Sequence, residues 1–162
     1  MPDEEMKLEI ELVPSTTWKE NVRSYVSEEE WDVIRRAVYR RAEFVCEVCG
    51  GKGEEHPVEC HEVWEYDDIN HVQRLKRMIA LCPDCHMVKH MGLASSNGRL
   101  PDAVEHYAEV NDLSFLEAME KIEKAFEKHG ERSTHEWEVD MSILEGTAYK
   151  AFIKERLDEP YE

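Results

Sequence analysis

The chain has 162 residues and a net charge of −17, and its hydrophobic and charged fractions of 41% and 35% are typical of a soluble globular protein. No apolar run approaches the roughly 18 residues that a membrane-spanning helix needs. The acidic start MPDEEMKLEI lacks the apolar stretch of a secretory signal. We therefore expect no membrane contact and a cytoplasmic location, and the charge argues against broad non-specific binding to nucleic acid.

The acidic excess is unevenly distributed along the chain. It lies in the first 30 residues and from Leu100 onward, whereas residues 31–99 carry nearly equal numbers of basic and acidic side chains and contain all five cysteines. The acidic C-terminal part could dock on a basic surface of another protein.

The first predicted elements are a strand and a long helix. Residues 7–12 alternate charged and apolar side chains, which predicts a half-buried strand that ends at Pro14. Ser27 and Glu30 form a capping box ahead of apolar residues at helical spacing, which predicts a helix over 28–43.

The later elements alternate between extended and helical patterns. In chain order we predict extended stretches over 58–64 and 72–81, helices over 83–91, 101–110 and 114–128 with a loop at 95–98, a short strand at Trp137 and Val139 that pairs with the first strand, and a last helix over 142–157.

Four of the cysteines form two CxxC pairs, Cys46 with Cys49 and Cys82 with Cys85. Two such pairs supply the four soft ligands of a tetrahedral structural zinc ion. Disulfides are the alternative, which a cytoplasmic location disfavours. Cys60 is left over, either as a small buried residue or as a ligand beside His61.

Three histidines accompany the cysteine pairs. His61 lies in the extended stretch between the pairs, and His86 and His90 follow Cys85. His86 and His90 are four residues apart, so they share one face of the predicted helix and could bind one ion. A histidine on a half-buried strand can also be purely structural.

The segments CEVCG, VECHEVW and LCPDCHMVKH together resemble the HNH endonuclease family, including a small bacterial and phage subgroup of it. The resemblance covers about residues 42–93. It implies an α+β fold with a ββα-metal core that a four-cysteine zinc site holds together. We therefore expect one compact domain with three parts: an N-terminal strand and loop (1–26), the HNH-like core (27–99), and an acidic, mainly helical region (100–162).

The resemblance also implies a reaction, the hydrolysis of phosphodiester bonds in nucleic acid, with DNA as the expected substrate. His61 matches the general base that takes a proton from the attacking water. His86 and His90 match ligands of a second divalent ion, which is Mg²⁺, Mn²⁺, Ni²⁺ or Zn²⁺ in the family; histidine ligands favour the transition metals.

Two positions depart from the family pattern. Cys60 stands where a ligand of the catalytic ion is usually Asp or His, and thiolate suits Mg²⁺ badly. Arg77 stands where the family has an Asn that orients the base; Arg77 could instead contact phosphate, or the site could be inactive.

Basic residues near these motifs are candidates for contact with nucleic acid. A cluster in the long helix could follow a phosphate backbone, or it could be a solvated face that forms ion pairs. The candidates are Arg35, Arg36, Arg40 and Arg41 in this cluster, and Arg74, Lys76 and Lys89 nearer the histidines.

Three functions remain open. The first is the metal-dependent HNH endonuclease. The second is a catalytically degenerate zinc protein that binds or inhibits a protein partner through its acidic surface, as a phage counter-defence protein would. The third is a metal sensor in which Cys60, His61, His86 and His90 close a second zinc site.

Overall fold

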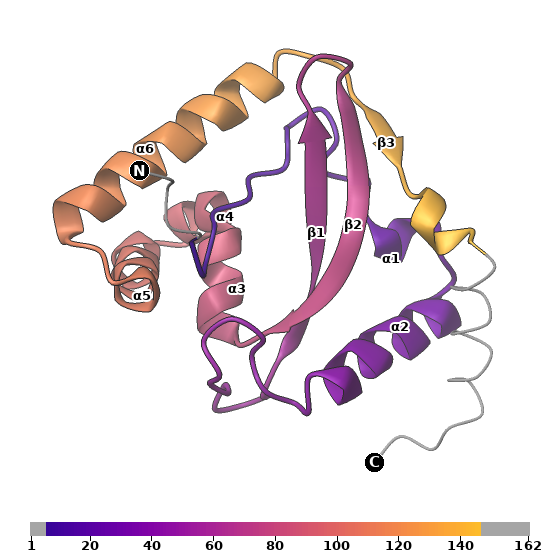
Figure 1. The fold of residues 1–162 in the computed structure, drawn as a ribbon, viewed down its shortest axis with the longest axis horizontal. Coiled ribbons are helices and arrows are strands. Elements are labelled where there is room, and N and C mark those ends of the chain that lie inside the picture. Colours follow the sequence, from indigo (N-terminus) through magenta and orange to yellow (C-terminus); the bar gives the residue numbers. More distant parts are fainter. Residues whose placement is uncertain (1–5, 147–162) are drawn as a thin grey trace.

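The computed structural model describes residues 6–146, which form a mixed α+β fold with one three-stranded sheet and six α-helices (Figure 1). Within these residues no helix has both the length and the apolar character to cross a membrane. The elements are α1 (Val22–Tyr25), α2 (Glu28–Arg41), β1 (Glu59–Asp67), β2 (Val72–Leu81), α3 (Pro83–Lys89), α4 (Met91–Ser96), α5 (Leu100–Asn111), α6 (Phe115–Arg132), β3 (Glu138–Asp140) and a 3-10 turn, η1 (Ser142–Leu144).

The sheet separates two apolar cores. β1 and β2 form an antiparallel hairpin, and β3 lies parallel to β2 on its other side. Because successive residues of a strand face opposite sides, Met78 and Ala80 pack into the core that contains α2, whereas Ile79 and Leu81 pack into the core that contains α3. Helices α2 and α3 therefore lie on opposite faces of the hairpin (Figure 1).

The long helix begins where its sequence predicts. Ser27 caps α2 by accepting a hydrogen bond from the Glu30 backbone N–H. After Arg41 the backbone enters the left-handed region at Glu43 (φ 57°) and Phe44 (φ 61°), which ends the helix and turns the chain toward the first cysteine pair.

The helices that follow the hairpin depart from prediction at two points. The helix predicted over 83–91 ends at His90, whose φ of −104° and ψ of 50° are not helical, and α4 then takes in Ser95 and Ser96, which were expected in a loop. Helix α6 has the predicted capping box at Ser114 but continues through Gly130 to Arg132, since an isolated glycine costs a helix only about 1 kcal/mol.

The predicted strand over residues 7–12 does not form. Residues 6–21 contain neither helix nor strand, although Leu8, Ile10 and Leu12 do pack on the core of α3. The side-chain amide of Asn111, at the end of α5, bonds to both the N–H (3.0 Å) and the C=O (2.9 Å) of Leu8. Alternating hydrophobicity thus identified the buried side chains, but a side-chain amide takes the place of a neighbouring strand.

The C-terminal elements also correct the prediction. The strand near Trp137 forms, as β3, but it pairs with β2 and not with the N-terminal segment. Of the helix predicted over 142–157, residues 142–144 form only a 3-10 turn, and residues 147–157 lie outside the described residues.

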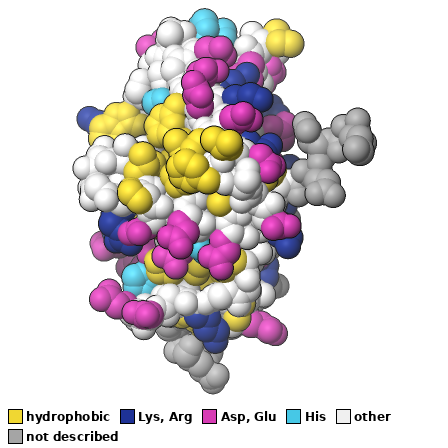
Figure 2. Space-filling view, turned by 90° about the vertical axis from the view of Figure 1, so that its left-hand side faces the viewer, with side chains coloured by type: hydrophobic (Ala, Val, Ile, Leu, Met, Phe, Trp, Pro, Cys, Tyr) yellow, Lys and Arg dark blue, Asp and Glu magenta, His cyan; other side chains and the backbone are white. Residues whose placement is uncertain are grey.

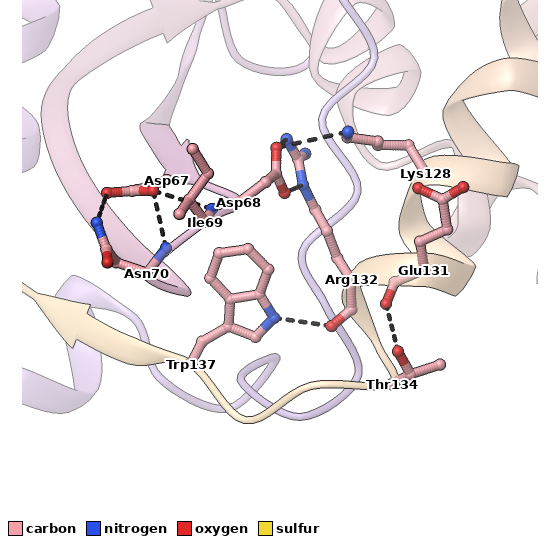
Figure 3. A network of polar contacts seen from close by, with 9 residues as sticks. All are labelled: Asp67, Asp68, Ile69, Asn70, Lys128, Glu131, Arg132, Thr134 and Trp137. Atoms are coloured by element: carbon pink, nitrogen blue, oxygen red, sulfur yellow. Dashed lines mark hydrogen bonds and ion pairs between the residues drawn. The ribbon is translucent and has the colours of Figure 1, made fainter.

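The turn of the hairpin is fixed to the end of α6 (Figure 3). Asp68 accepts two hydrogen bonds from the Arg132 guanidinium, at 2.9 and 3.0 Å, and pairs with Lys128 at 3.5 Å. The indole N–H of Trp137 donates to the Arg132 carbonyl at 2.7 Å. These contacts fix the far end of β1 and β2 relative to the helices on the α3 side.

Replacing Asn111 with alanine should lower the free energy of unfolding by about 1–3 kcal/mol, because the buried backbone groups of Leu8 lose their partners. Urea unfolding monitored by circular dichroism, at a fixed zinc concentration, measures this loss. Asn97→Ala, at an exposed position after α4, is the matched control and should change stability by less than about 0.5 kcal/mol. Equal losses in both variants would contradict the role given to Asn111.

Candidate metal centres

The two cysteine pairs meet at one point. Cys46 and Cys49 come from the loop after α2, and Cys82 and Cys85 from the start of α3. Their four sulfurs lie within 4.8 Å of one another, and the sulfurs of Cys49 and Cys82 are 3.6 Å apart. Ligands at about 2.3 Å from a tetrahedral zinc ion are separated by roughly 3.8 Å. The geometry therefore fits zinc.

Backbone amides surround these sulfurs. The N–H groups of Cys49, Gly51 and Cys85 donate to the sulfurs of Cys46 (3.5 Å), Cys49 (3.4 Å) and Cys82 (3.4 Å). Gly50 has a φ of 77°, which permits the tight turn of the first pair. Such amide dipoles stabilise thiolates.

The thiols influence one another strongly. A hydrogen bond with Cys85 lowers the pKa of Cys46 to about 4, and the same interaction raises the pKa of Cys85. Without a cation the cluster thus favours one thiolate that its neighbour stabilises. A bound zinc ion would allow all four thiols to ionise.

A histidine outside the motifs contacts this cluster. His106 of α5 lies with its Nε2 3.1 Å from the Cys85 sulfur. A ring N–H there would donate to the thiolate, as outer groups around metal ligands do. This role could not be predicted from the sequence, because His106 has no motif spacing to the cysteines.

The three motif histidines converge beside α3. His61 comes from β1, His86 from α3 and His90 from the junction of α3 and α4. One ring nitrogen from each lies within 4.8 Å of the other two. The Nε2 atoms of His86 and His90 are 3.0 Å apart, which agrees with neighbouring ligands of one ion at about 2.1 Å. The structure brings together the histidines that the sequence singled out.

Two carboxylates orient these rings. Glu59, two residues before His61 on β1, bonds to Nδ1 of His86, which leaves Nε2 of His86 facing His90. Glu11 lies 3.3 Å from Nε2 of His61, and it also faces Lys89 at 3.5 Å. Carboxylate–histidine pairs of this kind are usual around metal ligands.

Burial disfavours the charged form of two of these rings, those of His61 and His90. It lowers the pKa of His61, and it lowers that of His90 to about 4, with the charge of His86 as a further cause. Burial opposes ionisation of Glu11, but its contacts with His61 and Lys89 outweigh this effect and lower its pKa. A neutral imidazole can either bind a cation or accept a proton.

Cys60 does not belong to this group. It neighbours His61 in the strand, so its side chain faces the other side of the sheet and packs into the core of α2. Burial raises the pKa of its thiol to about 12. The expectation that Cys60 is a ligand of the second ion is therefore wrong in this structure.

Arg77 lies on the histidine face. Its partner in the ladder is Val63, and the partner of His61 is Ile79, so Arg77 is diagonally across from His61 on the neighbouring strand. Its side chain is exposed. The pairing of β1 with β2 shifts between Val63 and Trp64, and Lys76 is the additional residue of β2 at this point. Its side chain is exposed as well.

The other basic candidates are largely occupied. Lys89 is only 5% exposed and faces Glu11, so it is not a surface contact for phosphate. Ion pairs also join Arg35 to Asp32 (2.9 Å), Arg41 to Glu47 (3.0 Å) and Arg74 to Asp140 (3.1 Å). Arg36 and Arg40 also have interaction partners. The basic side chains of α2 therefore have partners within the protein, and they do not form a freely exposed basic surface.

A cleft of about 260 Å³ opens beside the histidines. Its walls include Trp18, Arg23 and Trp31, and Trp18 is 64% exposed. Glu11, Glu20 and Glu62 also line it, so its walls carry more acidic than basic side chains. Nothing matches this chain in comparisons with family models, with curated proteins or with solved structures.

Replacing Cys82 with serine should remove most of one equivalent of zinc from the purified protein and lower its thermal stability, because three thiolates hold zinc less tightly than four. Atomic emission measures the metal content after dialysis. Cys60→Ser is the matched control and should retain all metal. Loss of metal from Cys60→Ser would contradict the placement of that thiol.

Replacing His106 with phenylalanine should weaken zinc binding about 10–100-fold, the usual effect of losing a group that supports a metal ligand. Competition with a chromophoric chelator measures the affinity. His129→Phe, in α6, serves as the control. Unchanged affinity in His106→Phe would show that the contact with Cys85 is only packing.

Proposed function

We propose that the chain is a metal-dependent endonuclease of the HNH type, with β1, β2 and α3 as its ββα-metal core. The convergence of His61, His86 and His90 beside a four-cysteine cluster carries this proposal. The hairpin supplies one histidine and the helix that follows it supplies the others. This is the arrangement that the sequence resemblance implies for a base and the ligands of an ion.

In this proposal His86 and His90 hold the divalent ion. Glu59 holds the proton on Nδ1 of His86, so the Nε2 lone pair is available as a ligand. When bound, the ion would neutralise charge on the scissile phosphate and on the departing 3′ oxygen. Since Cys60 faces the other core, the protein ligands are imidazoles, which favour Zn²⁺, Ni²⁺ or Mn²⁺ over Mg²⁺.

His61 acts as the general base. Its ring is neutral near neutral pH and can take a proton from the attacking water. Glu11 accepts a hydrogen bond from Nε2 of His61, so Nδ1 is the nitrogen left to accept that proton. The Glu11 carboxylate then stabilises the positive charge that the ring acquires, as the acid of a hydrolytic triad does.

Arg77 contacts a phosphate of the substrate. It is exposed, and it lies on the same face of the hairpin as His61. With a net charge of −17, the protein would bind nucleic acid weakly, and cleavage would fall steeply as salt increases. DNA is the substrate that the resemblance favours.

One observation favours a second function. His61 is only 5% exposed, and its Nε2 contacts Glu11 of the N-terminal segment at 3.3 Å. A buried histidine suits a third metal ligand in a site that binds an ion without catalysis. In such a metal-binding protein, His61 would be a ligand, and the ion would not bind without it.

The test is a cleavage assay at low salt with plasmid and single-stranded DNA and RNA, run in turn with Mg²⁺, Mn²⁺, Ni²⁺ and Zn²⁺. His61→Ala should reduce cleavage by about 10²–10⁴-fold, the usual contribution of a general base. His129→Ala is the control and should cleave at the wild-type rate. Absence of wild-type cleavage with every metal and substrate would contradict the proposal.

A metal titration separates the two functions. Under the nuclease proposal, His61→Ala still binds the second ion through His86 and His90, whereas His86→Ala and His90→Ala lose it. If His61→Ala loses the ion as completely as His86→Ala does, His61 is a ligand, and the assignment of the base is wrong.

A further inference from the structure

Helices α5 and α6 enclose an apolar groove on the side of the molecule away from α2 (Figure 1). Its volume is about 470 Å³, and its walls include Val104 and Ala108 from α5 and Phe115 and Met119 from α6. Of the side chains that line it, only Glu105 is charged. The groove shares no residue with either candidate metal centre.

Large apolar side chains of α6 remain exposed, and two of them, Phe115 and Met119, line this groove. Phe115 is 67% exposed and Leu116 is 74% exposed, and Met119 and Phe126 are each 37% exposed. At 100° per residue these four lie within about one third of the helix circumference, next to Ala118 and Ile122, which α6 buries. Phe115, Leu116 and Met119 lie within one turn of one another, and a cluster of exposed apolar side chains of this kind marks a site of interaction.

Acidic residues border this cluster on the solvent side. By the same helical geometry Glu127 and Glu120 follow the exposed apolar residues around α6, and Glu123 lies at nearly the same angle as Leu116. Lys121 and Lys124 lie farther around the helix. Across the groove, Glu105 and the exposed Glu109 lie one turn apart on α5. Figure 2 shows this face, with hydrophobic side chains gathered together and Asp and Glu side chains above and below them.

We propose that the groove between α5 and α6 binds a basic amphipathic helix of a partner protein. The apolar face of such a helix would fill the groove, and its lysines and arginines would meet Glu105 and Glu109 on one border and Glu120, Glu123 and Glu127 on the other. A second copy of this chain fits less well, because it would bring one acidic border against another. This inference does not depend on nuclease activity.

The test uses a fluorescent synthetic peptide of about 18 residues, made of leucine and lysine with leucine at helical spacing. A peptide of the same composition, shuffled so that no apolar face forms, separates groove binding from simple charge attraction. We expect the amphipathic peptide to bind the full chain at least about tenfold more tightly than the shuffled one, as measured by fluorescence anisotropy at physiological salt.

Two variants locate the binding. The double variant Phe115→Gln and Met119→Gln removes exposed apolar side chains. The double variant Glu120→Lys and Glu123→Lys reverses the charge of the acidic border. Each double variant should bind the amphipathic peptide about tenfold or more weakly than the wild type. Glu54→Lys with Glu55→Lys makes the same change of charge at exposed positions before β1 and should change binding less than about twofold. Circular dichroism and zinc content verify that each variant is folded.

Three results would overturn the inference. They are equal binding of the shuffled peptide, wild-type binding by the Phe115→Gln and Met119→Gln variant, and no binding of the amphipathic peptide. Sedimentation equilibrium tests a fourth result. If the wild-type chain is a dimer and the Phe115→Gln and Met119→Gln variant is a monomer, the occupant of the groove is a second copy of the chain.

Discussion

The four-cysteine cluster is the constraint on which the rest of the candidate site depends. It joins the loop after α2 to the first turn of α3, and β1 and β2 lie between these two points in the chain. The Glu47 backbone N–H donates to the Ala80 carbonyl at 2.9 Å, which attaches the same loop to β2. Because α3 begins at this cluster, the positions of His86 and His90 relative to His61 follow from it. In a chain of this size a zinc ion there would stabilise the fold and position the histidines together.

The pleat of β1 divides the chemistry between two sides of the sheet. Glu59 and His61 face α3, where they meet His86 and His90, whereas Cys60 faces α2 and behaves as an apolar core residue. The N-terminal segment completes the site, because Glu11 places a negative charge between His61 and the buried Lys89. The overall charge of −17 therefore does not describe the histidine cluster, where Glu11 contacts His61 and Lys89 and Glu59 contacts His86.

Much of this arrangement could be predicted from short-range patterns. The cysteine pairs and the histidines four residues apart come together as their spacing predicts. The predicted capping box forms at Ser114, whereas at Ser27 only the bond from the Glu30 N–H to the serine side chain forms. The placement of Cys60 was predictable too, because adjacent residues of a strand cannot share a face. Glu11, His106 and Asn111 were not predictable, since their partners lie far away in the chain and no local spacing marks them. The pairing of β3 with β2 was not predictable either, because hydrophobic alternation identifies the buried face of a strand but not the strand beside it.

We propose that this chain holds two metal ions in two chemically different centres, one of thiolates and one of imidazoles. X-ray absorption spectroscopy of the full chain, loaded with zinc and then with one equivalent of nickel, tests it most directly. We expect zinc with four sulfur ligands at about 2.3 Å and nickel with at least two imidazole ligands and no sulfur. Nickel with sulfur ligands, or displacement of zinc with no second ion retained, would contradict it.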